Sequence, residues 1–141
     1  MKLLRLLALL VIGFSASAFA QCAAFPCVVA TVSLTNQSQT IPATPMFTPS
    51  ATGLYRLTSY MTTSTGTTDA YWTIEVGWTD NRGFKKGYLG GASQNAASIY
   101  PPFLVQATAG QPLLYQILLH GGGKGSGGMT YDLYITVEQL Q

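Results

Sequence analysis

The alternation of apolar and polar residues in segment 71–78 constrains the fold of this chain more than any other feature. Trp72, Ile74, Val76 and Trp78 fall on one side of an extended strand, and the residues between them fall on the other side. The same period of two recurs along the chain, and no segment after residue 20 has the 3.6-residue apolar period of a helix. Strands are expected at 28–34, 54–61, 71–78, 84–89, 103–107, 113–119 and 131–137, with an edge strand or an extended loop around Phe47.

About eight short strands with turn signals between them predict an all-β protein, an antiparallel β-sandwich of jelly-roll type. Asp80-Asn81-Arg82-Gly83 is a turn tetrapeptide, so it indicates a hairpin that joins the strands on either side. Segment 113–119 is apolar on both faces, which is typical of a central strand. Lys85 and Lys86 are typical of an edge strand, where lysine discourages pairing with another chain.

Residues 1–20 have the three parts of a secretory signal peptide. Lys2 and Arg5 precede an apolar segment at 6–14, and Ala18-Phe19-Ala20 places small residues at a cleavage site. The apolar segment is too short to span a bilayer, which takes about 20 residues. A lipoprotein variant is disfavoured because Gln21, which is not a small residue, precedes Cys22. We therefore expect a secreted or periplasmic protein.

Cleavage after Ala20 changes the charge of the chain. Of seven Lys and Arg residues, Lys2 and Arg5 leave with the signal peptide, so five remain against five Asp and Glu residues. A neutral mature chain has no basic surface with which to attract nucleic acid or anionic lipid. We expect no nucleic-acid partner and, after signal cleavage, no membrane.

Cys22 and Cys27 are the only cysteines, and in an exported chain they predict a disulfide. Residues 21–27 are then an N-terminal segment closed by this disulfide, and 28–141 form a single β-sandwich domain. A zinc site takes four ligands, and His120 is the only histidine. We therefore expect no metal and no cofactor.

The residues offer no convincing catalytic set. His120-Gly121-Gly122-Gly123 matches an oxyanion-hole tetrapeptide of lipases, but the surroundings of Ser126 lack the first glycine of the G-x-S-x-G elbow. A glycosidase would need two carboxylates facing each other, such as Glu75 with Asp132 or Glu138, yet solvated strand residues explain these acids more simply. We expect no catalytic residues and a protein that is not an enzyme.

The aromatic residues suggest contact with a partner. Trp72 and Trp78 are expected in the core, whereas Tyr71 and Tyr134 lie opposite the core-facing sides of their strands. Exposed tyrosines are enriched at protein interfaces, and their rings can also stack on sugars. Tyr71 and Tyr134 are therefore the candidate interface or ligand aromatics.

Several segments resemble the jelly-roll domains of the tumour necrosis factor and complement-type globular superfamily. The resemblance rests on Phe47, on Gly53–Leu57, on Leu104–Gly110 before the apolar strand at 113–119, and on the aromatic terminal segment 131–140. It implies a homotrimer with a binding or scaffolding role and carries no catalytic residues. The chain departs from that family in having no collagen-like stalk and no calcium-type cluster of carboxylates.

The sequence is also similar to short uncharacterised bacterial and phage proteins with a GLYR…GWTD pattern, matched here by Gly53–Arg56 and Gly77–Asp80. This second resemblance implies no activity.

Together these features favour an exported, non-enzymatic domain that self-assembles as a trimer and serves in binding or surface structure. One alternative is a subunit of an extracellular filament that polymerises by donating its N-terminal strand, with Val28, Val29, Val32 and Leu34 as the donor residues. Another is a carbohydrate-binding module with a glycan or cell-surface partner, and a small secreted hydrolase is a further class. For the self-assembling domain and for the filament subunit, the main partner is another copy of the chain.

Overall fold

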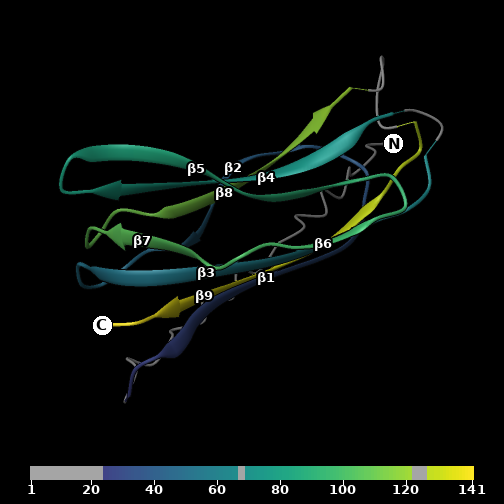
Figure 1. Ribbon diagram of the computed structural model, residues 1–141. Helices are drawn as coiled ribbons and strands as arrows, with labels where there is room; N and C mark the ends of the chain where they lie inside the picture. Colours follow the sequence, from purple (N-terminus) through teal and green to yellow (C-terminus); the bar gives the residue numbers. More distant parts are fainter. Residues whose placement is uncertain (1–23, 67–68, 122–126) are drawn as a thin grey trace, which may run out of the picture.

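The computed structural model describes residues 24–66, 69–121 and 127–141, which form nine β-strands in two antiparallel sheets packed face to face (Figure 1). Sheet A has the order β1-β9-β3, with β6 and β7 both paired to the far edge of β3, and sheet B has the order β2-β8-β4-β5. The strands are β1 (Cys27–Gln37), β2 (Ile41–Phe47), β3 (Gly53–Thr63), β4 (Tyr71–Asp80), β5 (Gly83–Ser93), β6 (Ala97–Ile99), β7 (Phe103–Ala107), β8 (Leu113–His120) and β9 (Tyr131–Gln139).

The connections between strands are those of a jelly roll. The chain crosses from one sheet to the other at nearly every step, and it stays within a sheet only between β4 and β5 and between β6 and β7. This arrangement confirms the expected antiparallel β-sandwich of jelly-roll type. The described residues contain nine strands instead of about eight because β6, which precedes Pro101 and Pro102, makes its own short pairing with β3.

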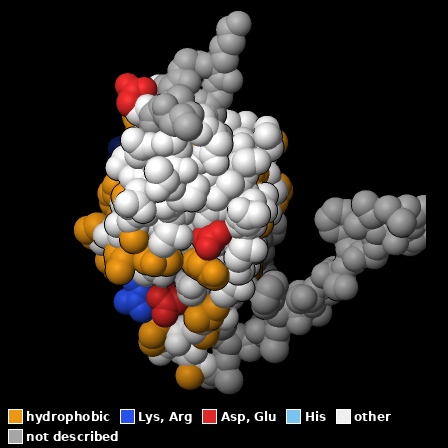
Figure 2. All heavy atoms as spheres, turned by 90° about the vertical axis from the view of Figure 1, so that its right-hand side faces the viewer, with side chains coloured by type: hydrophobic (Ala, Val, Ile, Leu, Met, Phe, Trp, Pro, Cys, Tyr) orange, Lys and Arg blue, Asp and Glu red, His pale blue; other side chains and the backbone are white. Residues whose placement is uncertain are grey.

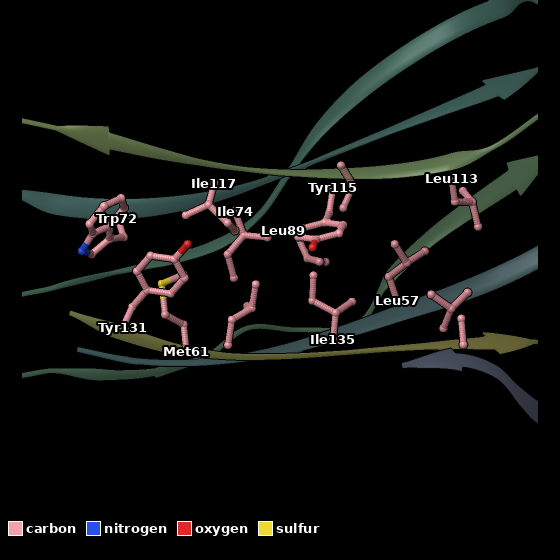
Figure 3. Packing of buried hydrophobic residues seen from close by; sticks show 14 of the residues in the cluster. Leu57, Met61, Trp72, Ile74, Leu89, Leu113, Tyr115, Ile117, Tyr131 and Ile135 are labelled. Carbon is pink, nitrogen blue, oxygen red and sulfur yellow. The ribbon is translucent and has the colours of Figure 1, made fainter. Parts of the chain in front are cut away.

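The core lies between the two sheets and follows the period of two. Trp72, Ile74 and Val76 of β4 face it, as expected, and so do Leu133 and Ile135 of β9. Figure 3 shows side chains from the two sheets pointing toward each other along the sandwich, with Trp72 and Tyr131 near one end of the labelled group. The rings of these two residues lie 4.7 Å apart between centroids. The predicted core position of Trp72 is therefore confirmed.

The first strand departs from simple alternation. Alternation along the strand expected at 28–34 predicts Val28 and Ala30 on one face and Val29 on the other, but Val29 and Ala30 are both buried while Val28 is 55% exposed. The cause is a shift in the pairing of β1 with β9 between Val28 and Ala30. A bulge places two residues opposite one, so the residues before it turn to the other face. The expected orientation of Val28 is wrong for this reason.

The β4–β5 hairpin forms at the expected turn. Gly83 has φ +102°, which favours glycine, and the Arg82 backbone N–H donates to Asp80 Oδ1 at 2.7 Å. β5 is an edge strand, as the lysines indicated, and β8 is a central strand between β2 and β4.

The predicted signal peptide (1–20) and Cys22 lie outside the described residues. Cys27 begins β1, and its pairing with Cys22 stays a prediction. In the three described stretches, no helix is long and apolar enough to cross a membrane.

Candidate binding surfaces on the two sheets

Tyr71 and Tyr134 lie on different sheets, and both are partly open to solvent. Tyr71 of β4 is 45% exposed and Tyr134 of β9 is 43% exposed. Each alternates with buried neighbours on its strand, so each points away from the core. The two candidate aromatics therefore belong to two separate surfaces, the outer faces of sheet B and sheet A.

Around Tyr134, the outer face of sheet A carries a row of large side chains. Tyr134 is directly opposite Tyr60 of β3, with 6.2 Å between the ring centroids, and Tyr60 is in turn opposite Ile99 of β6. Ile99 is 80% exposed. Directly opposed residues of antiparallel strands share a face, so these three side chains form a continuous apolar row across the sheet.

A second row on the same face contains an ion pair between apolar residues. Arg56 Nε donates to Glu138 Oε2 at 2.6 Å, and the register places Val28 beside Glu138 and Leu104 beside Arg56. This hydrogen bond to Arg56 lowers the pKa of the Glu138 carboxyl, and Glu138 raises the pKa of Arg56 in return. Each of these charges thus already has a partner within the chain.

We define the sheet A patch as the exposed apolar side chains of these two rows. They come from every strand of sheet A, and they are Val28, Tyr60, Ile99, Leu104 and Tyr134. Figure 2, which views the molecule from the right-hand side of Figure 1, shows hydrophobic side chains in its middle and lower part, with a Lys or Arg and an Asp or Glu side chain next to each other among them.

On sheet B, Tyr71 is held by neighbours at one end of the outer face. Its ring stacks on the ring of His120, with 5.0 Å between centroids and 15° between planes. Thr73 Oγ1 and His120 Nε2 form a hydrogen bond of 2.9 Å. His120 therefore serves here as a packing partner of Tyr71 and Thr73. Gly122, Gly123 and Ser126, the rest of the lipase-like segment, lie outside the described residues.

Farther along sheet B, Tyr88 and Tyr100 support each other edge to face. Their hydroxyl oxygens are 3.3 Å apart, and the Tyr100 hydroxyl also lies 3.2 Å from the Gly91 carbonyl oxygen, to which it donates. Burial first, and then the hydrogen bond with Tyr100, raises the pKa of Tyr88 to about 12. A Cβ at Gly91 would lie 2.4 Å from the Trp72 carbonyl oxygen, so the close approach of Gly91 to the backbone of β4 requires glycine.

A shallow hollow lies beside Tyr88 on the outer face of sheet B. Its lining includes Glu75 and Gly77 of β4, Phe84 and Lys86 of β5, and Leu114 and Gln116 of β8, and we call it the sheet B hollow. The alternation of apolar and polar residues does not predict this hollow. The one available signal was Gly77, a glycine on the outward side of an otherwise regular strand, which often marks a close approach.

The candidate donor residues of β1 are part of the sandwich. β1 pairs with β9 of the same chain from Cys27 to Gln37, and Val29 is buried. Val32 and Leu34 pack against the core as partly buried side chains, whereas Val28 belongs to the sheet A patch. The strand that donation would require is thus already paired at the edge of sheet A.

The acids that could form a glycosidase pair do not face one another. Glu75 is on the outer face of sheet B, whereas Asp132 and Glu138 are on the outer face of sheet A. Asp132 Oδ1 accepts the backbone N–H of Asn36 at 2.7 Å. Among the described residues, no three His, Cys, Asp or Glu side chains come together as metal ligands.

The fold and these surfaces define the chain as a jelly-roll β-sandwich with an apolar patch on one outer face and a small hollow beside Phe84 on the other. Its sequence matches no family model and no curated protein.

Proposed function

We propose that the mature chain is an exported, non-enzymatic β-sandwich that assembles with copies of itself, as a trimer, and serves in binding or surface structure. The sheet A patch is the observation that carries this proposal. It joins two tyrosines to exposed aliphatic side chains across one sheet. Interface cores are enriched in Tyr, and the patch contains two tyrosines, with the hydrogen-bonded Arg56 and Glu138 lying between its apolar side chains.

Charge also supports assembly through this face. Arg56 and Glu138 are hydrogen-bonded to each other, so a second copy would cover a paired charge and not an isolated one. An isolated charge is far more costly to remove from water. The neutral mature chain adds little repulsion between copies, because a net charge near zero favours association.

Assembly of complete sandwiches agrees better with the pairing of β1 than strand donation does. A donated β1 would have to leave β9 and remove Val29 and Ala30 from the core. Deletion of residues 21–35 distinguishes the two modes. Donation requires a folded protein that no longer polymerises, whereas assembly through sheet A predicts loss of the fold.

Light scattering on the mature chain, residues 21–141, tests the proposal. We expect the mass of a trimer for the wild type and of a monomer for Ile99→Lys, because lysine places a charge at the most exposed side chain of the patch. Phe84→Lys, at an exposed position of sheet B, is the matched control and keeps the oligomer. A wild-type monomer at all concentrations, or the same loss of mass in both variants, would contradict assembly through sheet A.

A further inference from the structure

A polar hollow lies on sheet A, at the end of the sheet where β1 and β3 end and β9 begins. Its volume is about 380 Å³, which is within the range of about 300–1,000 Å³ that small-molecule sites occupy. We call it the Asn36 hollow, and the lining residues that matter here are Thr35 and Asn36 of β1, Thr62 of β3, Ser64 and Thr130 beside these strands, and Asp132 of β9.

A second bulge of β1 lines this hollow. The register with β9 shifts between Leu34 and Gln37, so Thr35 and Asn36 together stand against one residue of β9, Asp132. Asn36 has φ +52°, a left-handed conformation that asparagine adopts more readily than most residues. Bulges are frequent next to functional sites, because they redirect a side chain away from the regular ladder.

Internal hydrogen bonds fix the lining of the hollow. Asp132 Oδ1 accepts the backbone N–H of Asn36 at 2.7 Å, which ties the bulge of β1 to β9. Beyond the end of β3, Ser64 Oγ accepts the Thr130 backbone N–H at 2.8 Å and lies 3.2 Å from the Thr130 hydroxyl, which also donates to it. Groups that are already fixed lose little freedom when a ligand binds.

Other polar groups of the hollow are available to a ligand, and its exposed lining is more polar than apolar. Within residues 24–66, 69–121 and 127–141, no hydrogen bond engages the Thr35 hydroxyl, the Thr62 hydroxyl or the Asn36 side-chain amide. Asp132 Oδ2 is likewise not engaged there, since only Oδ1 accepts from Asn36. The hydroxyls and the amide both donate and accept, whereas the carboxylate accepts.

This set of groups favours one class of ligand. An anion would meet the Asp132 carboxylate, and the described lining residues include no Lys or Arg to attract it. A metal ion would find one carboxylate among these residues, and a purely apolar molecule would take polar groups out of water without replacing their hydrogen bonds. A neutral molecule with several hydroxyls can donate to Asp132 and exchange hydrogen bonds with the hydroxyls and the amide.

We propose that the Asn36 hollow binds a neutral saccharide, with the sugar hydroxyls hydrogen-bonded to Asp132, Asn36 and Thr62. Thr62 and Asp132 are opposite each other, and Tyr60 and Tyr134 form the next row of the same face. The site is therefore adjacent to the sheet A patch but uses none of its side chains, so it does not depend on assembly. It adds a ligand class to the proposed binding role.

The test uses an array of neutral and acidic oligosaccharides with the mature chain, followed by titration calorimetry with the best-retained glycan. The wild type binds at least one neutral glycan. Asp132→Asn weakens binding by about tenfold or more, because it removes a charge-assisted hydrogen bond, while its amide oxygen can still accept from the Asn36 N–H. Thr62→Val weakens binding by up to about tenfold, whereas the matched control Thr58→Val, on the same face of β3, keeps wild-type affinity.

Absence of binding to every neutral glycan on the array would overturn the saccharide site. So would wild-type affinity in both Asp132→Asn and Thr62→Val, or equal losses in Thr62→Val and Thr58→Val. Circular dichroism confirms that each variant is folded, and light scattering on the same samples reports assembly separately. An intact oligomer without binding to neutral glycans rejects the site alone, and a wild-type monomer that binds a neutral glycan rejects assembly alone.

Discussion

A comparison of Leu57 with Leu104 distinguishes the stability that comes from burial in the core from the stability that comes from burial between two copies of the chain. Leu57 on β3 is fully buried, whereas Leu104 on the neighbouring strand β7 is 57% exposed in the sheet A patch. The same Leu→Ala change at the two positions removes the same atoms. The only difference is what surrounds them.

The expected magnitudes follow from the two environments. Leu57→Ala leaves a cavity between the sheets, so it lowers the free energy of unfolding by about 2–5 kcal/mol. Full burial of a leucine side chain contributes about 1.5–3 kcal/mol. The 57% of Leu104 still exposed therefore contributes about 1–2 kcal/mol per protomer when a second copy covers it.

Urea denaturation at two protein concentrations measures both effects. The wild-type midpoint rises with concentration, because assembly stabilises the folded state by mass action. Leu57→Ala lowers the midpoint at both concentrations, whereas Leu104→Ala lowers it mainly at the higher one. A wild-type midpoint independent of concentration, or equal losses for the two variants at the lower concentration, would contradict the distinction between core and patch.

Three further outcomes follow from single contacts. The hydrogen bond from Arg56 lowers the pKa of the Glu138 carboxyl, so in a carboxyl NMR titration Glu138 ionises at a pH below the ordinary glutamate range. Arg56→Gln returns the pKa of Glu138 toward 4.5. An unchanged titration in this variant would contradict the ion pair. Burial, and next the neighbouring Tyr115, raises the pKa of Tyr131 to about 12, so stability falls between pH 10 and about 12 as only the unfolded chain ionises. Tyr131→Phe reduces the alkaline loss of the urea midpoint without abolishing it, because other tyrosines with a raised pKa, such as Tyr88, remain. It also removes the 2.9 Å hydrogen bond to the Gln39 carbonyl oxygen, and an equal alkaline loss in this variant would refute the assignment. Gly91→Ala lowers the melting temperature because its Cβ collides with the Trp72 carbonyl oxygen, and an unchanged temperature would contradict that packing.

The fold could be predicted from the sequence where strand alternation is regular. In β4, Trp72, Ile74 and Val76 gave the buried face directly, and Tyr71 was correctly assigned to the other face. The alternation is regular in such strands because one face of each sheet packs against the core and the other face does not. The class of fold followed from the number of these segments.

The bulge in β1 could not be predicted in the same way. Val28, Val29 and Ala30 are all apolar, so their sequence does not indicate which residue is the extra one. The shift is determined by the pairing with β9, more than 100 residues away in the chain, and only the assembled sheet reveals it. The orientation of Val28, and with it one edge of the sheet A patch, depends on this non-local pairing.

The two candidate surfaces, on sheet A and sheet B, show the same limit. Tyr60, Ile99 and Tyr134 are far apart in the sequence and meet only because β3 lies between β6 and β9. In the sheet B hollow, Phe84 lies over Gly77 across the hairpin. The sequence indicated the outward tyrosines, but not which residues of neighbouring strands would join them.

Photo-crosslinking from Ile99, the most exposed side chain of the sheet A patch, tests the proposed assembly most directly. A photoreactive amino acid replaces Ile99 in the mature chain, and mass spectrometry identifies the crosslinked peptides between isotopically distinct copies. Assembly through sheet A predicts intermolecular crosslinks to peptides that contain Tyr60, Leu104 or Tyr134. Crosslinks within single copies only, or intermolecular crosslinks confined to sheet B, would contradict it.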